Sequence, residues 1–172
     1  TEGLYYGKPR IDFELLKKYH EGLICLSACI QGELPQLLLN GREEDAYRVA
    51  KEYKELFGPD RYYIEIQDHG LDEQKEVAVK LIKLSKDLDI PLVLTNDVHY
   101  CNKDDAEAQD ALRCIGFKKL LDEPHQTMGG GRKEWYLKTE QEMSILFPNY
   151  PEAMANTIKI ANMCKSAEIG RA

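Results

Sequence analysis

The residues best suited to chemistry are Asp97 and His99, which flank Val98 at the end of a short apolar run. In an extended chain, residues two apart point to the same side, so this carboxylate and this imidazole are expected to be able to share one ion. Such a pair suits zinc, manganese or iron, and a thiolate from Cys29 would favour zinc. The alternative is that Asp97 caps the next turn and His99 is an ordinary hydrogen-bonded side chain.

Three short apolar segments have the composition of strands, and helical patterns separate them. Strands joined by helices of this length need crossover connections, which predict a parallel sheet, either a barrel or an open doubly wound sheet. The predicted strands are 22–26, 62–66 and 91–95, and the predicted helices between and before them are 12–19, 46–57 and 77–88.

The predicted strand ends place chemically active side chains at one edge, where active sites of parallel α/β folds form. These ends are Ser27-Ala28-Cys29, Gln67-Asp68-His69-Gly70 and Asn96-Asp97-Val98-His99. Simpler interpretations exist for two of them. Cys29 could instead be a small buried side chain. His69 could instead be a turn residue before Gly70.

The other histidines are weaker candidates. His20 lies at a predicted helix C-terminus, where it would interact with the helix dipole. His125 lies in a loop with no ligand partner nearby in the sequence.

The C-terminal third of the sequence predicts a helix over 104–117, then a loop with Pro124 and three consecutive glycines. A capping box that begins at Thr139 opens the next helix, and Pro151 can begin the last one. We therefore expect a division into 1–118, a linker over 119–133, and a segment 134–172.

Composition excludes several classes of protein. The formal net charge of −7 argues against a free-standing nucleic-acid binder. The five cysteines form no CxxC pair, so neither a zinc finger nor a disulfide framework is expected, and a reducing cytoplasm is the natural setting. No apolar run is long enough for a membrane helix. The chain starts at Thr1 without a methionine, which suggests a segment of a longer protein.

Three ordered motifs resemble the PHP (polymerase and histidinol phosphatase) domain of bacterial DNA polymerase III alpha subunits. The likeness continues through EWYLK and PEA and covers nearly the whole chain. The three motifs are YHEGLICLSAC at 19–29, EIQDHGL at 65–71 and TNDVHY at 95–100, and the two shorter ones lie at 134–138 and 151–153.

The resemblance implies part of a distorted seven-stranded β/α barrel with a helical C-terminal extension. Its rim would bind up to three metal ions, zinc or manganese and possibly iron, with Asp97, His99 and Cys29 as ligands. Asp68 and His69 would lie at the rim without a defined ligand role. The remaining ligands would precede Thr1, so the isolated chain is expected to hold metal weakly or not at all.

For the parent protein, the resemblance implies a cytoplasmic replicative DNA polymerase, with magnesium at a polymerase core beyond Ala172. Its partners would be primer-template DNA, deoxynucleotides, the sliding clamp and a proofreading exonuclease subunit. The PHP part would be a 3′–5′ proofreading exonuclease or, alternatively, a non-catalytic scaffold that braces the polymerase and docks a separate exonuclease. A small metal-dependent phosphoesterase is a third interpretation. We expect the chain alone to be inactive and to self-associate through open sheet edges.

Overall fold

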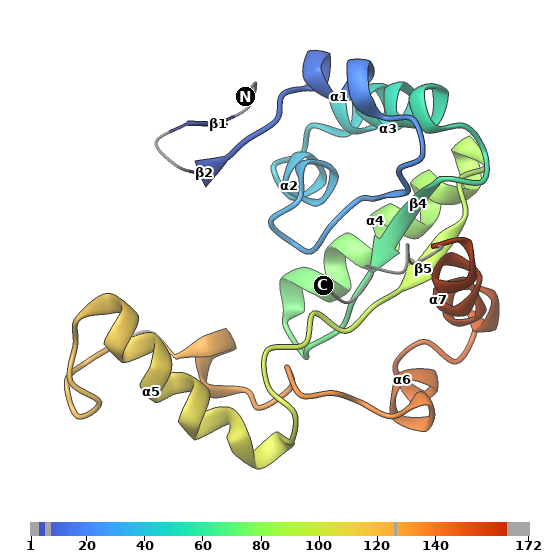
Figure 1. Ribbon diagram of the computed structural model, residues 1–172. Coiled ribbons are helices and arrows are strands. Elements are labelled where there is room, and N and C mark those ends of the chain that lie inside the picture. The colour runs from blue at the N-terminus through green and yellow to red at the C-terminus, as the bar shows by residue number, and fades with distance from the viewer. Residues whose placement is uncertain (1–3, 6–7, 126, 165–172) are drawn as a thin grey trace, which may run out of the picture.

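A three-stranded parallel sheet lies at the centre of the computed structural model, which describes residues 4–5, 8–125 and 127–164 (Figure 1). The strands β3 (Cys25–Leu26), β4 (Tyr62–Ile66) and β5 (Leu92–Leu94) are adjacent in that order. All three predicted strands are confirmed, although the first and the third are shorter than expected. Because the strands are parallel and adjacent, their carboxyl ends share one edge.

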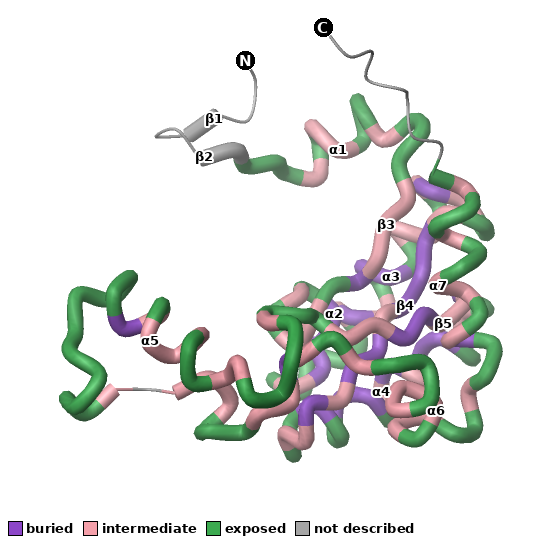
Figure 2. Tube along the Cα trace, turned by 60° about the horizontal axis from the view of Figure 1, so that its bottom comes forward, coloured by how far each residue is buried: buried purple, intermediate pink, exposed green. Residues whose placement is uncertain are grey.

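One face of the sheet carries the main hydrophobic core. Alternation along β4 directs Tyr62, Ile64 and Ile66 into this core, where each is at most 2% exposed. The crossover helices α3 (Glu43–Phe57) and α4 (Asp72–Leu88) pack there. Figure 2 shows the buried residues gathered along β4, β5 and α4. Burial of these alternating side chains therefore orients the sheet and its carboxyl edge.

One core helix was not predicted. Helix α2 (Glu33–Leu39) buries Leu34, Pro35 and Leu38 against α3 and α4. Its proline lies in the first turn, where the missing N–H would have no helical partner in any case. The three consecutive leucines at 37–39 also obscure the helical period. Tertiary burial therefore stabilises a helix that local patterning conceals.

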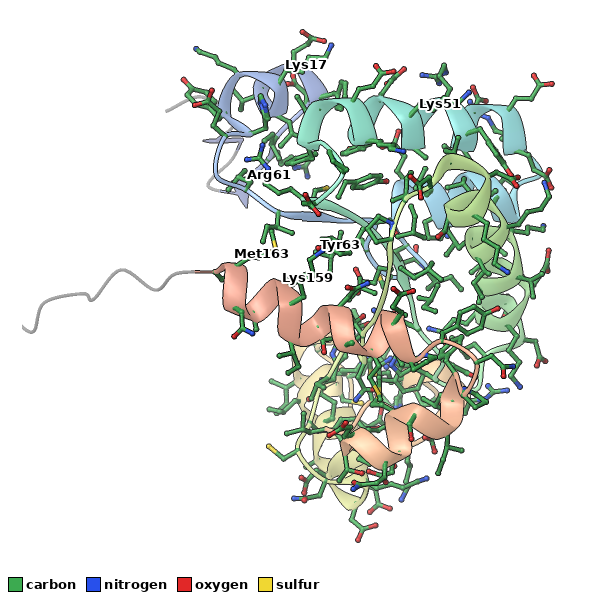
Figure 3. The ribbon with its side chains drawn as sticks, turned by 90° about the vertical axis from the view of Figure 1, so that its right-hand side faces the viewer. Lys17, Lys51, Arg61, Tyr63, Lys159 and Met163 are labelled. Carbon is green, nitrogen blue, oxygen red and sulfur yellow. The ribbon has the colours of Figure 1, made fainter. Side chains whose placement is uncertain are left out.

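The opposite face is covered in part by α7 (Pro151–Met163), which runs along β5. The Asn156 amide donates to the Leu92 carbonyl over 2.8 Å, so α7 satisfies a backbone group on the outer edge of β5. At the other end of α7, Met163 and Lys159 lie on the Tyr63 side of the sheet (Figure 3). Pro151 occupies the first helical turn, as predicted.

The remaining elements largely follow the sequence prediction. Asp12 caps α1 (Phe13–Tyr19), and Thr139 begins α6 (Glu140–Leu146) with the predicted capping box. The predicted helix over 104–117 is divided into a short 3-10 turn, η1 (Lys103–Asp105), and α5 (Ala106–Phe117). In Figure 1, α5 extends away from the sheet.

The expected seven-stranded barrel is not confirmed. Within the described residues, the only strands besides the central three are β1 (Leu4–Tyr5) and β2 (Lys8–Pro9), which form a separate antiparallel pair. The chain therefore shows an α/β arrangement around a parallel sheet, the coarser part of the expectation.

Candidate metal centre

Asp97 and His99 lie side by side just beyond β5, with 3.5 Å between Oδ1 of Asp97 and Nε2 of His99. Both side chains are about 40% exposed, so they face solvent at the carboxyl edge. The prediction assumed an extended backbone at these two residues, but the backbone there is not extended. Asp97 has φ 41°, in the left-handed region, so a turn rather than strand alternation places the two groups together.

The segment after Asp97 is held by a distant part of the chain. The backbone N–H of His99 donates to the Trp135 carbonyl over 2.9 Å, and the N–H of Leu137 donates to the Tyr100 carbonyl over 3.2 Å. An isolated parallel bridge between Tyr100 and Tyr136 extends this contact. Residues 135–137 therefore fix the position of His99.

His69, beyond β4, is 1% exposed and both its ring nitrogens are engaged. Gln74 Nε2 lies 2.9 Å from Nδ1, and Nε2 lies 2.7 Å from the Asn96 carbonyl. Because the carbonyl can only accept, Nε2 carries the proton and Nδ1 accepts from the Gln74 amide. Burial lowers the pKa of His69, so the ring is held neutral. His69 therefore ties the ends of β4 and β5 together.

The ring of Trp135 stacks on His69, with centroids 4.7 Å apart and planes 1° from parallel. The three glycines over 129–131 form part of the turn η2 (Met128–Gly131). A Cβ added at Gly129 would lie 2.0 Å from the indole, so only glycine permits this close approach. The glycine-rich loop therefore packs closely against the indole of Trp135.

Cys29 and Asp68 occupy turns at the same edge. Asp68 Oδ1 accepts the Gly70 N–H over 2.7 Å. Cys29, partly buried, accepts the Gly32 N–H at its carbonyl over 2.7 Å. A Cβ at Gly32 would lie 2.4 Å from the Ser27 carbonyl oxygen, so the tight turn that places Cys29 requires glycine.

Polar side chains line the second face of the sheet toward this edge. Gln67 Nε2 donates to Glu65 Oε1 and to Thr95 Oγ1, each over 2.9 Å, and the Thr95 hydroxyl also donates to Glu65. Gln67 Oε1 is buried and has no hydrogen-bond partner among the described residues. This face of the sheet therefore has a buried hydrogen-bond acceptor without a donor, Gln67 Oε1.

The structure does not bring Cys29, Asp97 and His99 into one cluster of three donors. Among the described residues, the only group of three such side chains with ligand atoms within 4.8 Å of one another is Asp110, Cys114 and His125. A reason is that β4 separates β3 from β5, and two strand spacings amount to about 9.5 Å. The cluster of Asp110, Cys114 and His125 was not predicted from the sequence. The available signal was the pair Asp110 and Cys114, four apart on one face of a predicted helix.

A comparison with protein families matches residues 1–69 to the PHP domain. This match includes Cys29, Asp68 and His69 and ends before Asp97. Over 163 residues, 95% of its length, the chain is 54% identical to the DNA polymerase III subunit alpha of Treponema pallidum. It is 46% identical to that of Borreliella burgdorferi over 98% of its length, and 41% identical to that of Thermus aquaticus over 93%. Residues 1–69 thus match the PHP domain, and nearly the whole chain is similar to part of these alpha subunits.

The chain spans only 13–14% of the length of these relatives. In the described part of the chain, no helix is both long and apolar enough to cross a membrane.

Proposed function

We propose that this chain supplies part of a metal-dependent 3′–5′ exonuclease site within the alpha subunit of a replicative DNA polymerase. The observation that carries the proposal is the solvent-facing pair of Asp97 and His99, 3.5 Å apart at the carboxyl edge of a parallel sheet. The relationship to alpha subunits supplies the biological setting.

The donor chemistry fits a divalent metal. Asp97 offers a carboxylate oxygen and His99 an imidazole nitrogen, a set that zinc, manganese and iron accept. Cys29 stays a proposed third ligand from this chain, and Asp68 a rim residue. Metal bound here would polarise a phosphoryl oxygen and provide an activated water. Two adjacent donors are fewer than such a site needs, so the proposal requires further ligands from other parts of the alpha subunit.

The residues of this chain would position the metal rather than react. The backbone bonds from Trp135 fix His99, and the His69 bridge to Asn96 fixes the end of β5. Because His69 is buried and neutral with both nitrogens engaged, its role in the proposal is to hold the edge rigid. Such support keeps ligand geometry within narrow limits.

The test is trimming of a mismatched primer by an intact alpha subunit that carries Asp97→Asn or His99→Ala. We expect each substitution to lower hydrolysis at least about 100-fold while polymerisation persists, because the lost ligand acts only at this site. Matched controls are Asp60→Asn, at an exposed carboxylate, and His20→Ala, a histidine outside the edge. Undiminished trimming by the Asp97 and His99 variants would refute the exonuclease proposal.

A scaffold is the second candidate, and the surface of α5 favours it. The helix and the residues after it expose Leu112, Ile115, Phe117, Leu120 and Leu121, each more than half accessible. A run of this kind is typical of a protein contact surface. If the scaffold function holds, Ile115→Lys will weaken assembly of the alpha subunit with a replicase subunit, whereas Asp97→Asn will not change hydrolysis.

The remaining parts of the proposal concern the whole protein. They are DNA polymerisation with magnesium on primer-template DNA, a cytoplasmic location, and contacts with a sliding clamp and a proofreading subunit. The chain by itself is proposed to be inactive in hydrolysis.

A further inference from the structure

A mixed cluster of three ligand-type side chains lies between α5 and the loop that follows it. Asp110 and Cys114 are one turn apart on α5, and His125 returns from the loop to meet them. Nε2 of His125 lies 2.7 Å from Asp110 Oδ2, and the three ligand atoms lie within 4.8 Å of one another. The cluster is separate from the Asp97 and His99 pair.

An ion pair between Asp110 and His125 explains only part of this arrangement. The second carboxylate oxygen, Asp110 Oδ1, is buried and has no hydrogen-bond partner among the described residues. Leaving such an oxygen unsatisfied is costly. Cys114 is 3% exposed, so its thiol faces the same interior space rather than solvent. The carboxylate thus has a buried oxygen without a partner, and a bound cation would satisfy it.

The imidazole has the orientation that a metal ligand needs. Nδ1 of His125 lies 2.8 Å from the Glu123 carbonyl and carries a proton, while Nε2 donates to the Asp110 carboxylate over 2.7 Å. A metal bound at Nε2 would take the place of that second proton. Metal-bound histidines commonly donate their other ring N–H to such a backbone carbonyl. The loop that carries His125 is itself folded back, because Lys119 Nζ donates to the Pro124 carbonyl over 3.3 Å.

We propose that Asp110, Cys114 and His125 form a zinc site that fastens the loop after α5 to the helix. Thiolate and imidazole together select zinc over the hard cations. A tetrahedral zinc with bonds of about 2.0–2.3 Å separates its ligand atoms by about 3.3–3.8 Å. The observed cluster needs side-chain shifts of about 1 Å to reach that geometry.

The fourth zinc position is available to water. Asp110 and His125 also line a cavity of about 350 Å³ together with Thr127, Met128 and Arg132. A three-ligand site beside such a space leaves one coordination position open. Because the loop leads directly into the glycine turn that packs against Trp135, zinc here would stiffen the connection between α5 and the carboxyl edge of the sheet.

Cobalt titration of the metal-free chain tests the inference without any activity assay. Tetrahedral Co²⁺ bound to a thiolate gives a near-ultraviolet charge-transfer absorption, and zinc should displace it. We expect about one equivalent per chain, with the band lost in Cys114→Ser and the affinity reduced more than about tenfold in His125→Gln and Asp110→Asn. The last two side chains are partly exposed, so these variants should fold, which circular dichroism checks.

Matched cysteine variants decide which site holds the metal. Cys101→Ser, at an exposed cysteine, should keep the band, and so should Cys29→Ser. A band lost in Cys29→Ser but kept in Cys114→Ser would overturn this inference and support a metal at the carboxyl edge instead. Absence of any thiolate band in the unsubstituted chain would also overturn it, and would leave the exonuclease proposal untouched.

Discussion

The imidazole of His69 lies parallel to the indole of Trp135, with 4.7 Å between ring centroids. The two residues are far apart in the sequence, yet their stack joins the end of β4 to the segment that positions His99. The tryptophan is 5% exposed, and Gly129 packs closely against its indole ring. The candidate metal centre therefore depends on a packed layer of rings behind it.

Replacing Trp135 by alanine should destabilise the chain by about 3–5 kcal/mol, because the substitution removes a buried aromatic ring and leaves a cavity. Urea unfolding followed by circular dichroism measures the change. Ile145→Ala is the control, since Ile145 is 75% exposed and its truncation should cost less than about 0.5 kcal/mol. Equal unfolding midpoints for the two variants would contradict the packing described.

Gly129→Ala should destabilise the chain by about 1–3 kcal/mol, because the added Cβ would overlap the Trp135 ring and because φ is +54° there. Gly116→Ala provides the comparison within the same region. No atom lies within 4 Å of a Cβ at Gly116, which is inside α5, so that change should stabilise slightly through helix propensity. A thermal melt in which both variants lose stability alike would argue against the specific contact.

Stability should fall as the pH drops below about 6.5, the pKa of an unfolded histidine. Burial lowers the pKa of His69 in the folded chain, so the unfolded state binds the proton more readily. The contribution is fully present above the unfolded pKa and is lost as the pH falls toward the folded value. Nearby Lys138 lowers this pKa further, whereas Asp97 raises it.

Urea titrations at several pH values between about 5 and 8 test this in the presence of a chelator. His69→Gln should flatten the slope in that window. His20→Gln should preserve it, since His20 lies at the end of α1 outside the ring stack. A slope unchanged by His69→Gln would assign the effect to another group.

The pKa of Glu142 should rise from about 2 toward its usual 4.5 when Thr139 is changed to alanine. The main cause of the low value is the hydrogen bond from the Thr139 backbone, and the hydroxyls of Tyr136 and Thr139 add to it. Thr139→Ala removes one of these donors and weakens the cap. Carboxyl NMR titration measures the pKa directly, and Tyr136→Phe should also raise it.

The sign of the linked stability change follows from the lowered pKa. The Glu142 contribution is fully present above 4.5 and is lost as the pH falls toward about 2. Ser144→Ala is the control, because its hydroxyl bonds the Gln141 carbonyl instead. A Glu142 pKa that stays low in both Thr139→Ala and Tyr136→Phe would contradict the capping geometry.

The sequence by itself determined the three strands and their parallel direction, most of the helices and the cap at Thr139. It also identified Asp97 and His99 as neighbours, although the reason was a left-handed turn at Asp97 and not an extended strand. These features follow from periodicity and from residues close in the chain, whose energetics are local. The division at 119–133 stays a prediction.

Tertiary structure alone decided which distant side chains meet. Helix α2, the stack of His69 on Trp135 and the cluster of Asp110 with His125 depend on contacts between separate segments. The same holds for Cys29, which the sheet keeps apart from the pair beyond β5. Hydrophobic patterning specifies which face of an element is buried, but the partner it meets depends on how all the elements pack together.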